Sequence, residues 1–114
     1  MRAFGFLSFG HYSPAPGSRT RTAGEMLRQT VEIAEGADEL GVNGAFVRVH
    51  HFARQAASPI PVLTAMAAWT KRIEVGTGVI DMRYENPLYL AEEAAALDLL
   101  SDGRVALGVS RGSP

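Results

Sequence analysis

The sequence predicts an α/β protein in which parallel strands alternate with connecting helices. Short runs rich in Val, Ile and Phe alternate along the chain with longer segments whose apolar residues recur every three or four positions. These segments follow one another in the order β-α-β-α-β-α-β. Two strands that are joined by a helical crossover almost always lie parallel and form a right-handed unit. We therefore expect one parallel sheet with helices packed against it.

The first strand is predicted from Ala3 to Phe9. A loop rich in Pro, Gly and Ser follows, from Gly10 to about Thr22, and its length is typical of a functional lid or rim. The first helix is predicted from Ala23 to Leu40, with Gly41 as its C-terminal stop. Its buried face should carry the residues that recur at helical spacing, namely Leu27, Val31, Ala34 and Ala37.

The second strand is predicted from Ala45 to Val49. Ser58 is a favourable N-cap and Pro59 suits the first position of a helix, which continues from Val62 to Thr70. One stripe of this helix should be buried, and it carries Leu63, Met66 and Ala67.

The third strand is predicted from Ile73 to Ile80. Asn86-Pro87 repeats the pattern of an N-cap followed by proline, and the helix that it starts should end near Ser101-Asp102-Gly103. The fourth strand is predicted from Val105 to Ser110. The buried face of the third helix is marked by Leu90, Ala94 and Leu97.

The composition excludes several classes of protein. The 114 residues carry a formal net charge of -1, so no broad basic face is available and we expect no nucleic-acid partner. The absence of cysteine excludes a disulfide scaffold, a thiolate metal site and a cysteine nucleophile, and it favours a cytoplasmic location. The apolar part of the N-terminus is too short for a signal peptide, and no run is long enough to span a membrane.

Two common cofactor motifs are absent. Gly76-Thr77-Gly78 lacks the third glycine of a dinucleotide-binding motif and lies inside a predicted strand. No Gly-Lys-Ser/Thr phosphate loop occurs, which argues against a nucleotide hydrolase. The neighbouring rings of His50 and His51 should point to opposite sides of an extended segment, so one metal ion cannot easily bind both, and we expect no metal.

The two histidines are nevertheless the best candidates for chemistry. They follow a short apolar strand, and the carboxyl end of a buried parallel strand is where side chains first reach a cleft. Histidine is the side chain best suited to proton transfer near neutral pH. The alternative is that one or both rings only cap the strand with hydrogen bonds, and the residues alone do not separate these readings.

Four segments occur in a characteristic order and spacing. These are Val49-His50-His51-Phe52, Val75-Gly76-Thr77-Gly78-Val79, Asn86-Pro87 with Ala91-Glu92-Glu93, and Gly103-Arg104 with Gly108-Val109-Ser110-Arg111-Gly112. In these segments the chain resembles the luciferase-like flavin-dependent oxidoreductases, the bacterial luciferase family, whose fold is a TIM (β/α)8 barrel. The resemblance covers essentially the whole chain. Many relatives carry a glutamate immediately before the paired histidines, whereas this chain has Val49.

The resemblance implies a role for several residues. His50 would lie near the reactive edge of the flavin and serve in acid–base chemistry, whereas His51 would face away and be chiefly structural. A cis peptide bond is implied between Gly78 and Val79, against the isoalloxazine ring, although tight strand packing is a competing reason for Gly76 and Gly78. Arg111 would meet the phosphate of the cofactor, or else it is a solvated charge at the rim.

Two groups of loop residues could line a substrate pocket. One group follows the third strand and the other follows the first strand, so both would lie at the carboxyl end of the sheet. These residues are Asp81, Arg83, Tyr84 and Glu85 in the first group, with His11 and Tyr12 in the second.

The length predicts a partial barrel. A closed barrel of this type needs about 250 residues, so residues 1–114 are expected to form a single partial domain, the N-terminal half of an enzyme. Its first and fourth strands would be open edges, and the sheet face that fills the barrel interior would be exposed.

The resemblance implies a flavin-dependent oxidoreductase or monooxygenase in which a reduced flavin reacts with oxygen and a small organic substrate. The implied cofactor is reduced FMN, with a deazaflavin as the alternative, and a flavin reductase and a second copy of the chain are expected partners. The fragment itself would be inactive. The alternative function is a non-catalytic half-barrel that acts as an assembly or binding module.

Overall fold

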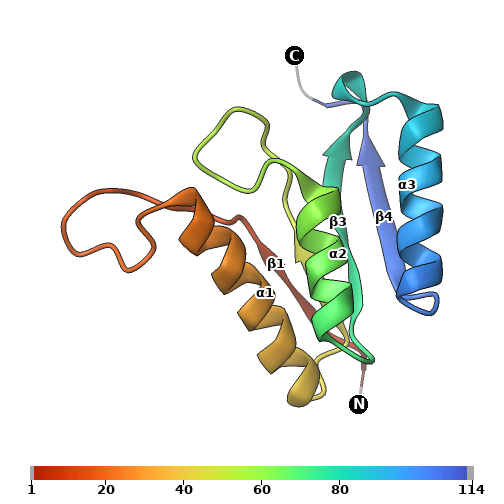
Figure 1. Ribbon diagram of the computed structural model, residues 1–114, viewed down its shortest axis with the longest axis horizontal. Helices are drawn as coiled ribbons and strands as arrows, with labels where there is room; N and C mark the ends of the chain where they lie inside the picture. Colours follow the sequence, from red (N-terminus) through yellow and green to blue (C-terminus); the bar gives the residue numbers. More distant parts are fainter. Residues whose placement is uncertain (1, 113–114) are drawn as a thin grey trace.

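A computed structural model describes residues 2–112 and contains one sheet of four parallel strands in the order β1-β2-β3-β4 (Figure 1). The strands are β1 (Gly5–Ser8), β2 (Gly44–Val47), β3 (Glu74–Asp81) and β4 (Val105–Ser110). They alternate with the helices α1 (Ala23–Glu39), α2 (Pro59–Trp69) and α3 (Pro87–Leu100). The predicted order of elements and the parallel sheet are therefore confirmed, and β1 and β4 are its edges.

Most element boundaries differ from the prediction by a few residues. Strand β1 is shorter than Ala3 to Phe9, and β2 ends at Val47, before Val49. The reason lies in the hydrogen bonds, because the backbone N–H of His50 donates to the carbonyl oxygen of Ala56 in the following loop, at 2.8 Å. His50 therefore no longer takes part in the strand ladder.

The ends of the helices confirm two of the predicted capping and stop residues. Gly41 has a φ of 83°, which is the left-handed conformation expected of a glycine that stops a helix. The side chain of Asn86 accepts hydrogen bonds from the backbone N–H groups of Leu88 and Tyr89 and caps α3 as predicted. Ser58 occupies the N-cap position of α2, but its side chain makes no capping hydrogen bond, and α2 begins at Pro59.

Two further elements lie outside the prediction. Thr22 and Glu25 form a capping box at the start of α1, in which each side chain accepts a hydrogen bond from the backbone of the other. A short 3₁₀ helix, η1 (Met82–Tyr84), follows β3 and turns the chain toward α3. None of the helices in the described part of the chain is long and apolar enough to cross a membrane.

The helices cover one face of the sheet, and the core lies between these two layers (Figure 1). Alternate strand residues such as Ala45, Val47 and Val75 point into this core and are completely buried. The opposite face carries Leu7 and Val79, which are 45% and 43% exposed. The predicted exposure of the face that would fill a barrel interior is thus confirmed for these side chains.

A buried carboxylate fastens α1 to the sheet at the end opposite to the histidines. Asp38 accepts hydrogen bonds from the backbone N–H groups of Lys71, Arg72 and Ile73, at 2.8 to 3.0 Å. Burial by itself would raise the pKa of Asp38, but these hydrogen bonds outweigh burial and hold the pKa below its ordinary value of 3.8. Asp38 therefore remains ionised and positions the turn that leads into β3.

Candidate functional site

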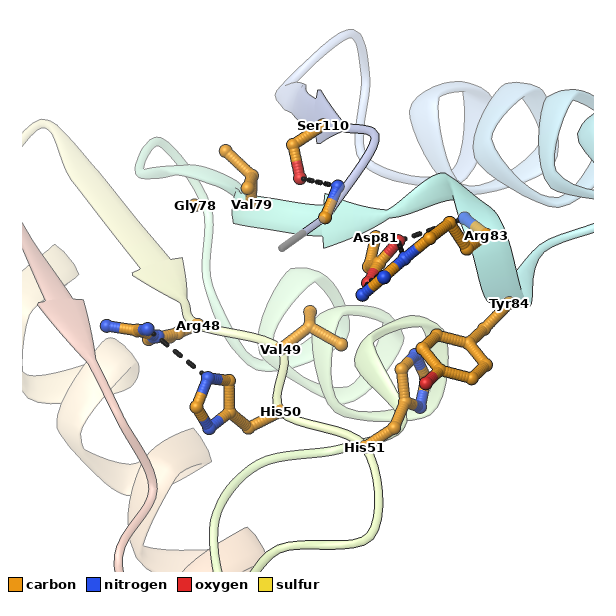
Figure 2. A pocket seen from close by; sticks show the side chains of 11 residues that line it. Arg48, Val49, His50, His51, Gly78, Val79, Asp81, Arg83, Tyr84 and Ser110 are labelled. Carbon is orange, nitrogen blue, oxygen red and sulfur yellow. Dashed lines mark hydrogen bonds and ion pairs between the residues drawn. The ribbon is translucent and has the colours of Figure 1, made fainter. Parts of the chain in front are cut away.

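An open pocket of about 360 Å³ lies at the carboxyl ends of β2, β3 and β4 (Figure 2). This is the edge of a parallel α/β sheet at which ligands usually bind. Its lining combines charged, aromatic and small residues from three separate parts of the chain. They are Arg48, Val49, His50, His51, Gly78, Val79, Asp81, Arg83, Tyr84, Ser110 and Gly112.

Arg48 and His50 form one wall of the pocket. The nitrogen Nη2 of Arg48 lies 3.2 Å from Nε2 of His50. Because arginine has no acceptor, Arg48 donates and Nε2 of His50 accepts. In the neutral ring the proton is then held on Nδ1, and His50 is oriented within the pocket (Figure 2).

Strand β1 and the residues that follow it support Arg48. The guanidinium lies over the ring of Phe9, with Cζ at 5.0 Å from the ring centroid. The ring of His11 stacks on Phe9 at 5.6 Å. The backbone N–H of Arg48 also donates to the carbonyl oxygen of Ser8, at 2.9 Å. The backbone and the side chain of Arg48 are thus both held from the neighbouring strand.

His51 is also among the residues that line the pocket, and its chiefly structural role stays a prediction. The two rings diverge, as predicted for neighbours, but β2 has already ended and the chain is turning at His51. The ring of His51 packs against Tyr84, with centroids 5.0 Å apart (Figure 2). Its Nε2 is buried and has no hydrogen-bond partner.

The end of β3 forms a second wall. The peptide bond between Gly78 and Val79 is cis, as expected, and the register with β4 shifts between Thr77 and Ile80. Gly78 faces the open side of the sheet, where a Cβ would lie 3.1 Å from Cδ1 of Leu7. Val79 presents an exposed apolar side chain to the pocket.

Gly76 has a different role from Gly78. A Cβ on Gly76 would collide with the carbonyl oxygen of Ala106 and lie 2.8 Å from the ring of Phe46. Gly76 thus allows β3 and β4 to approach closely, which is the packing role that the sequence left open. It does not line the pocket.

The charges at the far wall neutralise each other. Arg83 donates to Asp81 with an Nη2–Oδ2 distance of 2.7 Å, and its backbone N–H donates to Oδ1 at 2.9 Å. The hydrogen bonds from the side chain and then the backbone of Arg83 lower the pKa of Asp81 from its ordinary value of 3.8. Of the predicted rim residues, Asp81, Arg83 and Tyr84 line the pocket, whereas Glu85, His11 and Tyr12 do not.

Arg111 is exposed and is not among the lining residues, although its neighbours Ser110 and Gly112 are. The hydroxyl of Ser110 accepts a hydrogen bond from the backbone N–H of Gly112 at 3.1 Å, which shapes this rim. The assignment of Arg111 to a phosphate stays a prediction. No group of three or more metal-ligating side chains is gathered within residues 2–112.

Arg48 is the pocket residue that the motif analysis did not identify. A signal for it was present, because a charged residue interrupts an apolar run and stands two positions before His50. Residues two apart in an extended segment face the same side. Arg48 and His50 could therefore have been placed together on the open face of the sheet.

Comparison with known proteins identifies the family. The family model described as luciferase-like monooxygenase matches residues 4–114. The chain belongs to this family. The match extends from the start of the sheet through all of β4 and therefore includes every wall of the pocket.

Three luciferase-like proteins illustrate the similarity. The oxygenase component of a flavin-dependent trigonelline monooxygenase from Acinetobacter baylyi is 31% identical over 84% of this chain, and an F420-dependent glucose-6-phosphate dehydrogenase from Amycolatopsis mediterranei is 36% identical over 75%. The crystal structure of the monooxygenase RslO1 from Streptomyces bottropensis superimposes with a TM-score of 0.86 and 32% identity over 98% of the chain.

The chain spans only part of these relatives. It covers 27% of the length of the two enzymes and 34% of the RslO1 chain. The four strands and three helices of this chain match the N-terminal part of the luciferase-like barrel. The predicted fold class is thereby confirmed.

Proposed function

We propose that this chain forms the N-terminal part of a flavin-dependent oxidoreductase or monooxygenase in which reduced flavin reacts with oxygen and a small organic substrate. The observation that carries the proposal is the convergence of His50, Gly78 and Val79 on one pocket, at the carboxyl edge of a sheet that belongs to the luciferase-like family. We take residues 1–114 as a single partial domain.

The residues present fit a flavin. An isoalloxazine is flat, with apolar faces and a polar edge, and the pocket offers both kinds of surface. The exposed apolar side chain of Val79 and the bare backbone of Gly78 provide a wall without bulky groups. His50, which lines the same pocket, supplies a polar edge. The flavin supplies the redox chemistry when it is bound.

His50 is our candidate for the acid–base group. In the neutral ring Nδ1 carries the proton and Nε2 accepts from Arg48, so Nδ1–H can donate a hydrogen bond to a bound ligand, and the ring would take up a second proton at Nε2 when the hydrogen bond from Arg48 opens. His51 packs against Tyr84 and would shape the pocket, keeping water from one side of the bound ring. Arg111 is our candidate for the cofactor phosphate, and reduced FMN is the cofactor that we propose.

A deazaflavin is the alternative cofactor, and it is favoured by the similarity to an F420-dependent enzyme. The description of one relative as an oxygenase component supports a flavin reductase as a partner. We propose a homo-oligomer because α3 exposes large apolar side chains, among them Leu88, Leu99 and Leu100. The cysteine-free composition supports a cytoplasmic location.

The second candidate function is a non-catalytic half-barrel that pairs with itself or with a partner chain. The exposed apolar face that carries Leu7 and Val79 favours it, since such a face is suited to assembly.

A titration of the purified protein with FMN, monitored by flavin fluorescence, separates the two functions. If the chain is part of a flavin-dependent enzyme, FMN should bind saturably. The affinity for FMN should fall in Val79→Asp, which places a charge on the wall that we propose for the flavin ring. Leu40→Asp is the matched control, because Leu40 is 85% exposed and lies between the end of α1 and the start of β2, whereas the pocket lies at the carboxyl ends of the strands. Assembly without any flavin binding would favour the second function.

A further inference from the structure

Arg48 is a cation without an anionic partner. Within residues 2–112 no carboxylate lies within salt-bridge distance of its guanidinium, and the one hydrogen bond of its side chain goes to Nε2 of His50. The face of the guanidinium is occupied by Phe9, which leaves the remaining N–H groups at its edge free for a ligand.

The charges of the pocket do not cancel. Asp81 is the single carboxylate among the lining residues, and Arg83 already pairs with it at 2.7 Å. The position before the paired histidines is occupied by Val49, whose uncharged side chain is buried against Ile80 and Leu90. The pocket therefore keeps one uncompensated positive charge, that of Arg48.

An unpaired charge of this kind is costly once ligand or further chain covers the pocket. The free-energy cost of removing a guanidinium from water is offset only when an anion with matching hydrogen bonds is present. A planar guanidinium that is held at one face by Phe9 and at one N–H group by His50 is preorganised to bind an oxyanion through two parallel N–H groups.

We propose that Arg48 forms an anion subsite that selects an organic substrate bearing a carboxylate. This inference rests on the proposed function, since it places the acid group of the substrate beside His50. A phosphate presents the same oxyanion chemistry, but the phosphate of FMN is separated from the reacting ring by the whole ribityl chain. An anion that contacts both Arg48 and His50 would lie beside the proposed acid–base group, where the substrate reacts, and we therefore assign it to the substrate.

The test uses benzoate and its uncharged analogue benzamide as probes, and it measures their affinities for the purified protein by saturation-transfer NMR without flavin. We expect benzoate to bind about tenfold more tightly than benzamide, as a charge-assisted hydrogen bond predicts. Arg48→Gln should abolish this preference, and Arg48→Lys should retain part of it. Arg54→Gln is the matched control, because Arg54 is exposed in the next loop and does not line the pocket.

Equal affinities for the two probes in the unsubstituted protein would overturn the proposal, and so would a preference that survives in Arg48→Gln. Circular dichroism of each variant, together with the partial retention in Arg48→Lys, separates loss of the subsite from loss of the fold.

A second arm compares FMN with riboflavin, which lacks the phosphate. If Arg48→Gln removes a preference for FMN, the anion at Arg48 is the flavin phosphate and the assignment to a substrate fails. If neither flavin binds but the benzoate preference depends on Arg48, the proposed function fails and the anion subsite stands.

Discussion

Arg48 donates a hydrogen bond to His50, with 3.2 Å between Nη2 and Nε2, and the two side chains share the open face of the sheet. This contact joins the group that we assign to proton transfer with the group that we assign to anion binding. It also decides which nitrogen of the neutral imidazole carries the proton, because Nε2 is engaged as an acceptor.

The first prediction concerns the tautomer of His50. With Arg48 in place, the neutral ring should carry its proton on Nδ1, whereas Arg48→Leu removes the donor and should allow a mixture of tautomers. Nitrogen-15 NMR of labelled histidine, at a pH where the ring is neutral, measures this distribution directly. The ring of His51 makes no contact with Arg48 and serves as the internal control. An unchanged His50 spectrum in Arg48→Leu would show that the contact does not orient the ring.

The second prediction separates the two histidines. In a full-length context with the proposed activity, His50→Ala should lower oxygenation turnover by roughly a hundredfold, which is the usual contribution of a positioned acid–base group. Flavin affinity should change less than turnover. His51→Ala should mainly reduce stability, because the ring packs against Tyr84 and Phe52. Steady-state kinetics and thermal unfolding of both variants test this assignment, and equal or reversed losses of turnover would contradict it.

The third prediction concerns Asp38, which accepts hydrogen bonds from three backbone N–H groups. Asp38→Ala leaves these three donors without their acceptor, that of Ile73 in a buried position, and should lower the free energy of unfolding by about 2–3 kcal/mol. Glu39→Ala is the matched control, since Glu39 is the exposed neighbouring carboxylate, and it should change stability by less than about 0.5 kcal/mol. Urea unfolding of the three proteins measures both effects.

The contribution of Asp38 should depend on pH. Because folding lowers the pKa of this carboxyl from 3.8, its stabilising effect is complete above that value and is lost as the pH falls through the pKa of the folded state. The difference in unfolding free energy between the unsubstituted protein and Asp38→Asn should therefore shrink below about pH 4. A difference that stays constant into strongly acidic solution would mean that the charge of Asp38 is not involved.

The fourth prediction concerns the open face of the sheet when the 114-residue chain is expressed alone. Covering Leu7 and its neighbours would stabilise an assembly by about 25 cal/mol for each Å² of apolar surface removed from water. We expect dimers or larger species in sedimentation velocity, and Leu7→Lys should shift them toward monomer. Leu99→Lys tests the competing surface on α3, where Leu99 is exposed. A monomer that binds FMN tightly would contradict this prediction.

Much of the fold could be predicted because its signals are local. Asn86-Pro87 and Gly41 mark helix ends through the conformations and hydrogen bonds of a few adjacent residues, and both predictions were confirmed. The alternation of strands and helices predicted the parallel sheet, since strands joined by a helical crossover almost always lie parallel. The cis bond at Gly78-Val79 was expected from the family resemblance.

The tertiary structure alone decided where β2 ends and which side chains meet beyond the ends of the strands. The sequence placed two histidines after an apolar strand, but β2 ends at Val47 because the loop carbonyl of Ala56 competes for the N–H of His50. That turn directs His51 into the pocket against Tyr84 from a segment far along the chain. The stacking of Phe9 on Arg48 likewise requires β1 and β2 to lie side by side. Such contacts depend on the distances between separate elements, which no local pattern encodes.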